Sequence, residues 1–227
     1  MRILAVETST MAGSAALLDG DRIVGQSMLN IALTHSERLM AMVDRLLQDC
    51  EWQVESLEGV AVSIGPGSFT GLRVGIATIK GLALALSLPV APVPTLDALA
   101  SNVPFADAEV CPILDARKAE VYLSRYRSTT GRVERVWDYL ALSPRDAAER
   151  LTPPVIVLGD GVAACLPFLS HHGAAVRVAP PAQSVPSAAA VGQIGHAMLS
   201  SGDGVAADGL TPMYLRPSEA ELGAARR

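Results

Sequence analysis

Residues 63–73, with the sequence SIGPGSFTGLR, decide the fold of this chain. The apolar run Gly59–Ile64 predicts a short buried strand, and the glycines and proline that follow it predict a tight turn. A hydroxyl group of Ser68 or Thr70 can then cap a helix over Gly71–Ser87. A strand, a glycine-rich turn and a helix in this order form half of a βαβ unit, which is typical of an α/β fold.

The glycines of this turn have two interpretations. Glycines between a strand and a helix can let backbone N–H groups hold a phosphate. The spacing here is G-x-G-x-x-x-G, which differs from the G-x-G-x-x-G of dinucleotide-binding proteins, and no acidic residue follows about 20 positions later to hold a ribose. The Lys-Ser/Thr pair of a P-loop is also missing. A structural turn is therefore favoured over nucleotide binding.

The residues before this stretch predict three strands and a helix. The strand-like segments are Arg2–Ser9, Gly13–Leu18 and Arg22–Leu29. Asp-Gly between the last two is a hairpin signal. Apolar residues at helical spacing then predict a helix over Thr34–Cys50, with Thr34 and Glu37 as a capping box at its start.

A similar order of elements returns after about residue 105. The predicted strands are Glu109–Leu114, Glu120–Tyr126, Arg132–Trp137, Val155–Leu158 and Ala175–Val178, and helices are predicted from Ser143, from Gly161 to Leu169, and over Ser187–Leu199. We therefore expect two similar α/β lobes, residues 1–105 and 106–227, with the last helix and tail packing back on the first lobe.

Composition excludes several classes of protein. Of the 227 residues, 50% are hydrophobic and 18% charged, which excludes disorder over most of the length. The net charge of −5 argues against a stand-alone nucleic-acid binder, so any contact with nucleic acid is expected to be shared with another protein. The window 117–150 holds eight cations against five acids, and a solvated face is favoured there over a phosphate-binding patch.

Cysteine use and hydropathy predict a cytoplasmic protein with no membrane contact. The three cysteines, Cys50, Cys111 and Cys165, are scattered, as is usual for reduced thiols. The longest apolar stretch, Val74–Val93, contains a lysine and two prolines and is too interrupted for a membrane span.

The helices predicted over Thr34–Cys50 and Gly71–Ser87 carry more apolar surface than a helix needs when only one of its faces packs on a core. On the second helix, one face is small and the adjacent face is large and apolar. These faces either both belong to the core or include a contact with another chain. The candidate partner-interface residues are Leu39, Met40, Val43, Leu46, Gly71, Gly75, Thr78 and Leu82.

The sequence predicts no catalytic residue, metal site or cofactor. His35 has Leu39 one turn later, where a second metal ligand would lie. Glu7 ends the first strand, where an acid either holds a metal ion or a water, or caps the turn with hydrogen bonds. The candidate residues for a nucleotide cleft are Glu7, Thr8, Ser9, Gly159 and Gly161.

Four stretches resemble the TsaB (YeaZ) family of bacterial tRNA threonylcarbamoyladenosine synthesis. They are Ile3–Thr10, Thr34–Glu37, Ser63–Gly75 and Pro212–Arg216. The resemblance implies an α/β fold of the actin-like ATPase (ribonuclease H-like) type. Each of its two similar lobes would have a mixed sheet and flanking helices, as in sugar kinases and Hsp70 nucleotide-binding domains.

The resemblance also implies a role as a non-catalytic subunit. A TsaD-like paralogue would transfer threonylcarbamoyl to N6 of the adenosine next to the anticodon in tRNAs reading ANN codons. This chain would bind that paralogue through helices of the first lobe, together with a TsaE-like ATPase. TsaD-like enzymes carry a histidine pair and acidic residues after the first strand, whereas this chain has Leu39 and the turn Thr10–Gly13.

Two alternatives stay open at the level of sequence. One is an ATP-dependent small-molecule kinase or a metallopeptidase-like enzyme of the same fold, although the residues expected of either are missing. The other is a homodimer formed when the chain is alone, because a two-fold contact would use the same helices.

Overall fold

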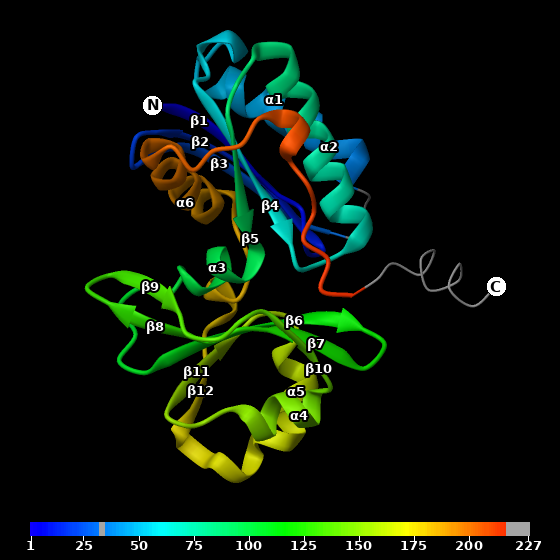
Figure 1. Ribbon diagram of the computed structural model, residues 1–227, viewed down its shortest axis with the longest axis vertical. Helices are drawn as coiled ribbons and strands as arrows, with labels where there is room; N and C mark the ends of the chain where they lie inside the picture. Colours follow the sequence, from blue (N-terminus) through cyan, green and yellow to red (C-terminus); the bar gives the residue numbers. More distant parts are fainter. Residues whose placement is uncertain (32–34, 217–227) are drawn as a thin grey trace, which may run out of the picture. The chain divides into compact units, whose positions relative to one another are not determined.

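The computed structural model describes residues 1–31 and 35–216, and the chain divides into two compact units (Figure 1). Unit 1 comprises Met1–Ala98 and Pro186–Pro212, and unit 2 comprises Leu99–Val185 and Met213–Arg227. The predicted capping box depends on Thr34, which lies outside the described residues.

Unit 1 is built on a five-stranded mixed sheet in the order β3-β2-β1-β4-β5. Its strands are β1 (Arg2–Glu7), β2 (Ala12–Asp19), β3 (Arg22–Asn30), β4 (Gly59–Gly65) and β5 (Val90–Pro94). The central strand β1 is antiparallel to β2 and parallel to β4. Strands β1, β4 and β5 therefore end at the same edge of the sheet.

Helices cover both faces of this sheet (Figure 1). Helix α1 (His35–Asp49) packs on β2, and α2 (Phe69–Leu86) packs on β4 as the crossover to β5. The opposite face is covered by α6 (Ala188–Ser201), which contacts β1, β2, β4 and β5. The short helix α3 (Thr95–Ala100) follows β5 directly.

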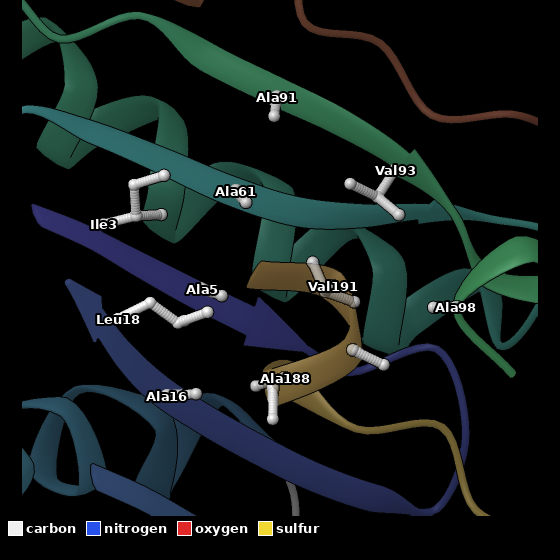
Figure 2. Close-up of a cluster of buried hydrophobic side chains, with 12 residues drawn as sticks. Ile3, Ala5, Ala16, Leu18, Ala61, Ala91, Val93, Ala98, Ala188 and Val191 are labelled. Atoms are coloured by element: carbon white, nitrogen blue, oxygen red, sulfur yellow. The ribbon is translucent and has the colours of Figure 1, made fainter. Parts of the chain in front are cut away.

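The core between α6 and the sheet consists mostly of small side chains. Figure 2 shows this cluster, in which alanines of β1, β2, β4 and β5 face Ala188 and Val191 of α6. A Cβ atom on Gly195 would lie only 2.5 Å from the Cβ of Ala61, and one on Gly192 would lie 2.2 Å from Cδ1 of Leu18. Glycine at both positions therefore lets the helix backbone approach the sheet closely.

The start of α2 confirms the capping prediction. The side chain of Ser68 is the N-cap and accepts a hydrogen bond from the Gly71 N–H at 3.3 Å. The helix ends at Ser87, which adopts the left-handed conformation and donates its N–H to the carbonyl of Ala83. Both ends of α2 thus have partners for otherwise unpaired backbone groups.

Unit 2 repeats the strand order of unit 1. Its sheet runs β10-β7-β6-β11-β12, with β6 antiparallel to β7 and parallel to β11. The strands are β6 (Glu109–Arg117), β7 (Glu120–Leu123), β8 (Tyr126–Thr129), β9 (Arg132–Arg135), β10 (Leu140–Leu142), β11 (Val155–Leu158) and β12 (Val176–Val178). Helices α4 (Pro144–Arg150) and α5 (Val162–Leu169) pack on β7 and β6.

The predicted strand Arg132–Trp137 is confirmed as β9, which ends at Arg135 and pairs only with β8 in a hairpin outside the main strand order. The strand at the position equivalent to β3 of unit 1 is β10, which the sequence did not predict. The predicted strand Glu120–Tyr126 is interrupted between β7 and β8, where the Ser124 hydroxyl donates to the carbonyl of Trp137. The three residues of β10 are too few to give a periodic signal.

We expect Gly195→Ala to destabilise unit 1 by about 1–3 kcal/mol, because the new methyl group has no room beside Ala61. Urea unfolding followed by the fluorescence of Trp52, in a Trp137→Phe background, measures this change. The matched control is Gly81→Ala on α2, where a Cβ would meet nothing within 4 Å. That variant should gain about 0.5–1 kcal/mol from helix propensity. Equal stability of the two variants would contradict the packing argument.

Candidate functional site

The glycine-rich turn after β4 is closed onto the end of β1. The Ser68 N–H donates a hydrogen bond to the Ser9 carbonyl at 2.6 Å, and the Thr8 hydroxyl donates to the Gly71 carbonyl at 2.9 Å. A Cβ on Gly67 would lie 2.4 Å from the same Ser9 oxygen. Glycine is therefore needed here for a close backbone contact inside unit 1.

Glu7 is fully buried at the end of β1. Its Oε1 atom accepts a hydrogen bond from the Ser9 N–H, which is the capping contact that was one of its two predicted roles. Burial raises the pKa of this carboxyl above its ordinary value of 4.5, although the neighbouring groups of Ser9 and Ser63 oppose the change. The residue therefore holds a proton to higher pH than an exposed glutamate does.

The glycines predicted for the cleft in the second lobe have an equivalent structural role in unit 2. A Cβ on Gly159, where φ is +109°, would lie 2.2 Å from the Ile113 carbonyl oxygen. A Cβ on Gly161 would lie 2.6 Å from the carbonyl carbon of Leu114, and Asp160 Oδ1 accepts a hydrogen bond from the Asp115 N–H at 2.9 Å. Glu7, Thr8 and Ser9 belong to unit 1, so a nucleotide cleft formed by both groups stays a prediction.

Most of the candidate interface residues are buried in the core of unit 1. Leu39, Val43 and Leu46 are buried on the inner face of α1, while Met40 is 54% exposed. Gly71 and Gly75 are also buried, and a Cβ on Gly75 would lie 2.3 Å from Oγ1 of Thr8. A bulky side chain at position 75 would therefore disturb the fold itself, and the role of these residues in a partner interface stays a prediction.

Thr78 and Leu82 are half-buried on α2, and the fully exposed face of this helix lies beside them. We call this face the α2 stripe, and its members are Arg73, Ala77, Gly81 and Leu84. Leu84 is 61% exposed, and the guanidinium of Arg73 stacks on the ring of Phe69 at 3.8 Å. The stripe was missed because α2 is apolar nearly all round, so polarity does not distinguish its inner face from its outer face.

Among the described residues, α2 is the one helix long and apolar enough to cross a membrane by length and composition. Six of its residues are buried in unit 1, and it connects the parallel strands β4 and β5. Its inner face is therefore a packing surface of the sheet.

Groups with the chemistry for metal binding or nucleophilic attack are sparse in the described part of the chain. No cluster of three or more His, Cys, Asp and Glu side chains occurs there. Burial raises the pKa of the Cys165 thiol to about 11 and that of Cys111 still further, so both thiols stay protonated. Leu39, one turn after His35, is a core residue of unit 1.

The cations of the window 117–150 mostly contact groups of unit 2 itself. Arg125 and Arg127 both pair with Glu109 beside an open depression of about 370 Å³. Arg117 pairs with Asp115, and Arg150 lies over the ring of Trp137. These contacts fit the interpretation of the window as a charged face rather than a phosphate site.

The Glu7 carboxyl should make the stability of unit 1 depend on pH. Because its pKa is raised on folding, its contribution is complete below pH 4.5 and is lost as pH rises through the folded-state pKa. The Glu7→Gln variant stays neutral, so it should gain stability relative to the wild type as pH rises. Urea unfolding at a series of pH values checks this, with the exposed Glu149→Gln as control. If the free energy of unfolding changes with pH in the same way in the wild type and in Glu7→Gln, the raised pKa of Glu7 is contradicted.

Comparisons with known proteins link the chain to tRNA threonylcarbamoyladenosine biosynthesis. The family model described as TsaD, tRNA N6-adenosine threonylcarbamoyltransferase, matches residues 30–163. The tRNA threonylcarbamoyladenosine biosynthesis protein TsaB of Bacillus subtilis (strain 168) is 33% identical over 227 residues, which cover 97% of this chain and 96% of that protein. The TsaB protein of Escherichia coli (strain K12) is 32% identical, with coverage of 95% of each chain.

Solved structures extend this agreement to the fold. YeaZ from Pseudomonas aeruginosa superposes with a TM-score of 0.80 at 29% identity, covering 94% of this chain and 99% of that one. The (R)-2-hydroxyglutaryl-CoA dehydratase component A of Acidaminococcus fermentans has a TM-score of 0.52 at 10% identity, covering 88% and 99%, which shows the fold alone. The predicted actin-like ATPase fold is thus confirmed. Because one third of the residues are identical over nearly the whole length, this chain belongs to the TsaB (YeaZ) family of tRNA threonylcarbamoyladenosine biosynthesis proteins.

Proposed function

We propose that this chain is a non-catalytic subunit required for threonylcarbamoyl transfer to N6 of the adenosine next to the anticodon in tRNAs reading ANN codons. It binds a TsaD-like catalytic paralogue, and a TsaE-like ATPase joins the pair. The observation that carries this proposal is the similarity to TsaB proteins over nearly the full length. The exposed apolar face of α2 supports the partner assignment.

The α2 stripe has the physical properties of a helix-docking surface. Ala77 and Gly81 lie one turn apart and leave room for a second helix to approach closely. Leu84 supplies exposed apolar area, and Met40 on α1 supplies more on the neighbouring helix. The stacked Phe69 and Arg73 add an aromatic ring and a guanidinium, which are the side-chain types that dominate binding energy at interfaces.

The chemistry of unit 1 fits a subunit without its own catalytic centre. Glu7 is capped by the Ser9 N–H inside the core, and the turn after β1 is in contact with the turn after β4. Position 39 carries a buried leucine where TsaD-like enzymes carry a histidine. We therefore assign the transfer step to the paralogue.

The net charge and the α2 stripe bear on two further partners, tRNA and a second copy of the chain. With a net charge of −5, and with cations of the window 117–150 paired to acids of unit 2, this chain reaches tRNA only through the complex. The α2 stripe also allows a homodimer when the chain is alone, because a two-fold contact uses the same surface twice. The place of action is the cytoplasm, where tRNA is modified.

Depletion of this protein in its own cells should lower threonylcarbamoyladenosine in total tRNA, measured by mass spectrometry of nucleosides. Expression of the wild-type chain should restore the nucleoside. Unchanged levels would contradict the proposed function. Phosphate release from ATP by the isolated chain would instead favour a kinase-like enzyme of the same fold.

The Leu84→Glu variant should weaken binding to the TsaD-like subunit of the same organism by at least about tenfold, because a charge would be buried against apolar surface. Isothermal titration calorimetry of the two purified proteins measures the affinity, and circular dichroism checks that the variant is folded. Leu166→Glu is the matched control, because Leu166 is exposed on α5 of unit 2.

If Leu84→Glu binds as tightly as the wild type, the α2 stripe is not the contact surface. Analytical ultracentrifugation of the isolated chain adds a second comparison. Loss of a homodimer in Leu84→Glu, with unchanged affinity for the TsaD-like subunit, would assign the stripe to self-association alone.

A further inference from the structure

The β8–β9 hairpin is an addition to the fold that the two units share. The path β10-β7-β6-β11-β12 of unit 2 corresponds to the five strands of unit 1, whereas β8 and β9 lie off this path (Figure 1). Residues 125–137, which include the hairpin, carry four arginines and one glutamate in a chain whose net charge is −5. Since the shared sheet does not need the hairpin, its basic surface is a candidate for binding.

The hairpin borders the open depression of about 370 Å³ in unit 2. Arg125 and Arg127 line this depression, and both pair with Glu109, so one carboxylate balances two guanidinium groups. Asp107, the other acid in the lining, pairs with Arg177. The charged side chains at the depression therefore leave one positive charge unbalanced, which favours an anionic ligand.

The guanidinium of Arg125 is fixed in place. Its side chain is only 13% exposed, its Nη2 atom donates to the Thr152 carbonyl at 2.9 Å, and it lies 5.2 Å from the centre of the Trp137 ring. Arg127 is 63% exposed, and its Nη2 atom donates to Glu109 Oε1 at 2.8 Å. Because a guanidinium binds a carboxylate through a planar fork of N–H donors, a fixed arginine beside an exposed one offers a preformed position for a carboxylate.

An exposed aromatic ring lies at the rim of the depression. Phe105 is 85% exposed, and the residues that follow it, Ala106–Glu109, line the depression. A Cβ on Gly131, in the turn of the hairpin, would lie 2.9 Å from two atoms of the Phe105 ring, and the Ser128 hydroxyl donates to the Pro104 carbonyl. The ring therefore rests on the hairpin instead of entering the core. Aromatic rings in such positions are typical anchors of protein interfaces.

The distribution of charge distinguishes a peptide from a nucleic acid. A nucleic acid presents a continuous row of phosphates and requires a continuous basic surface. Here Asp107 and Glu109 lie among the arginines, so a row of phosphates would meet like charges. A peptide can instead place a single carboxylate on Arg125 and Arg127 and an apolar side chain on Phe105.

We propose that the surface formed by Phe105, the β8–β9 hairpin and the depression beside it binds an acidic peptide segment of a partner protein. One aspartate or glutamate of this segment pairs with Arg125 and Arg127, and a neighbouring apolar side chain packs on the ring of Phe105. The surface belongs to unit 2 and does not include the α2 stripe. Its test is therefore independent of the proposed function.

Nuclear magnetic resonance titration of the ¹⁵N-labelled full-length chain tests the proposal. The probe is a hexapeptide of alternating glutamate and leucine with both ends blocked, and the control peptide has lysine in place of glutamate. We expect the glutamate peptide alone to shift the backbone amide signals of the hairpin and of Ala106–Glu109. The absence of such shifts at peptide concentrations up to about 5 mM would overturn the proposal. A uridylate decamer that gives these shifts at lower concentration than the peptide would overturn it in favour of nucleic acid.

Two pairs of variants locate the binding surface. Arg127→Glu and Phe105→Ala should each weaken binding of the glutamate peptide by at least about fivefold, because one loses the ion pair and the other the apolar contact. The matched controls are Arg145→Glu on α4 and Leu166→Ala on α5, both exposed in unit 2, and they should bind as the wild type does. Unchanged affinity in Arg127→Glu and Phe105→Ala would overturn the proposal. The dispersion of the amide signals checks folding, and if Phe105→Ala does not fold, Arg127→Glu decides.

Discussion

The backbone contact between Ser68 and Ser9 is the constraint on which the rest of unit 1 depends. It fixes the first turn of α2 against the end of β1, and that position brings Gly75 against Thr8. Because this contact fixes which residues of α2 face the sheet, it also fixes that Ala77, Gly81 and Leu84 face outward. One close approach between two turns thus determines both the core and the surface available to a partner.

A similar backbone contact occurs in unit 2, where Gly159 approaches the carbonyl of Ile113 in β6 as Gly67 approaches the carbonyl of Ser9 after β1. Along the shared path of five strands, both sheets have two antiparallel pairings followed by two parallel ones. Close backbone contacts occupy the turns at these strand ends in both units.

The sequence predicted the parts of this structure that depend on local chemistry. Ser68 was identified as a cap, the strands of unit 1 were found from their apolar runs, and the repeated order of elements was visible without matching residues. The inner face of α2 could not be found in this way, because it depends on Thr8, which lies 67 positions from Gly75 along the chain. The sequence did not predict β10, because its three residues give a weaker periodic signal than the alternating residues of β9.

The discontinuity of unit 1 has a consequence for the nascent chain on the ribosome. Its first 98 residues make the whole five-stranded sheet, but Ala188 and Val191, which complete the core on the α6 face, are about 90 residues further on. At about 5–20 residues per second, translation leaves that alanine-rich face uncovered for roughly 5–20 s. During this interval Leu99–Val185 emerges as one continuous segment. Unit 2 can therefore form its core from neighbouring residues before unit 1, which begins the chain, is finished.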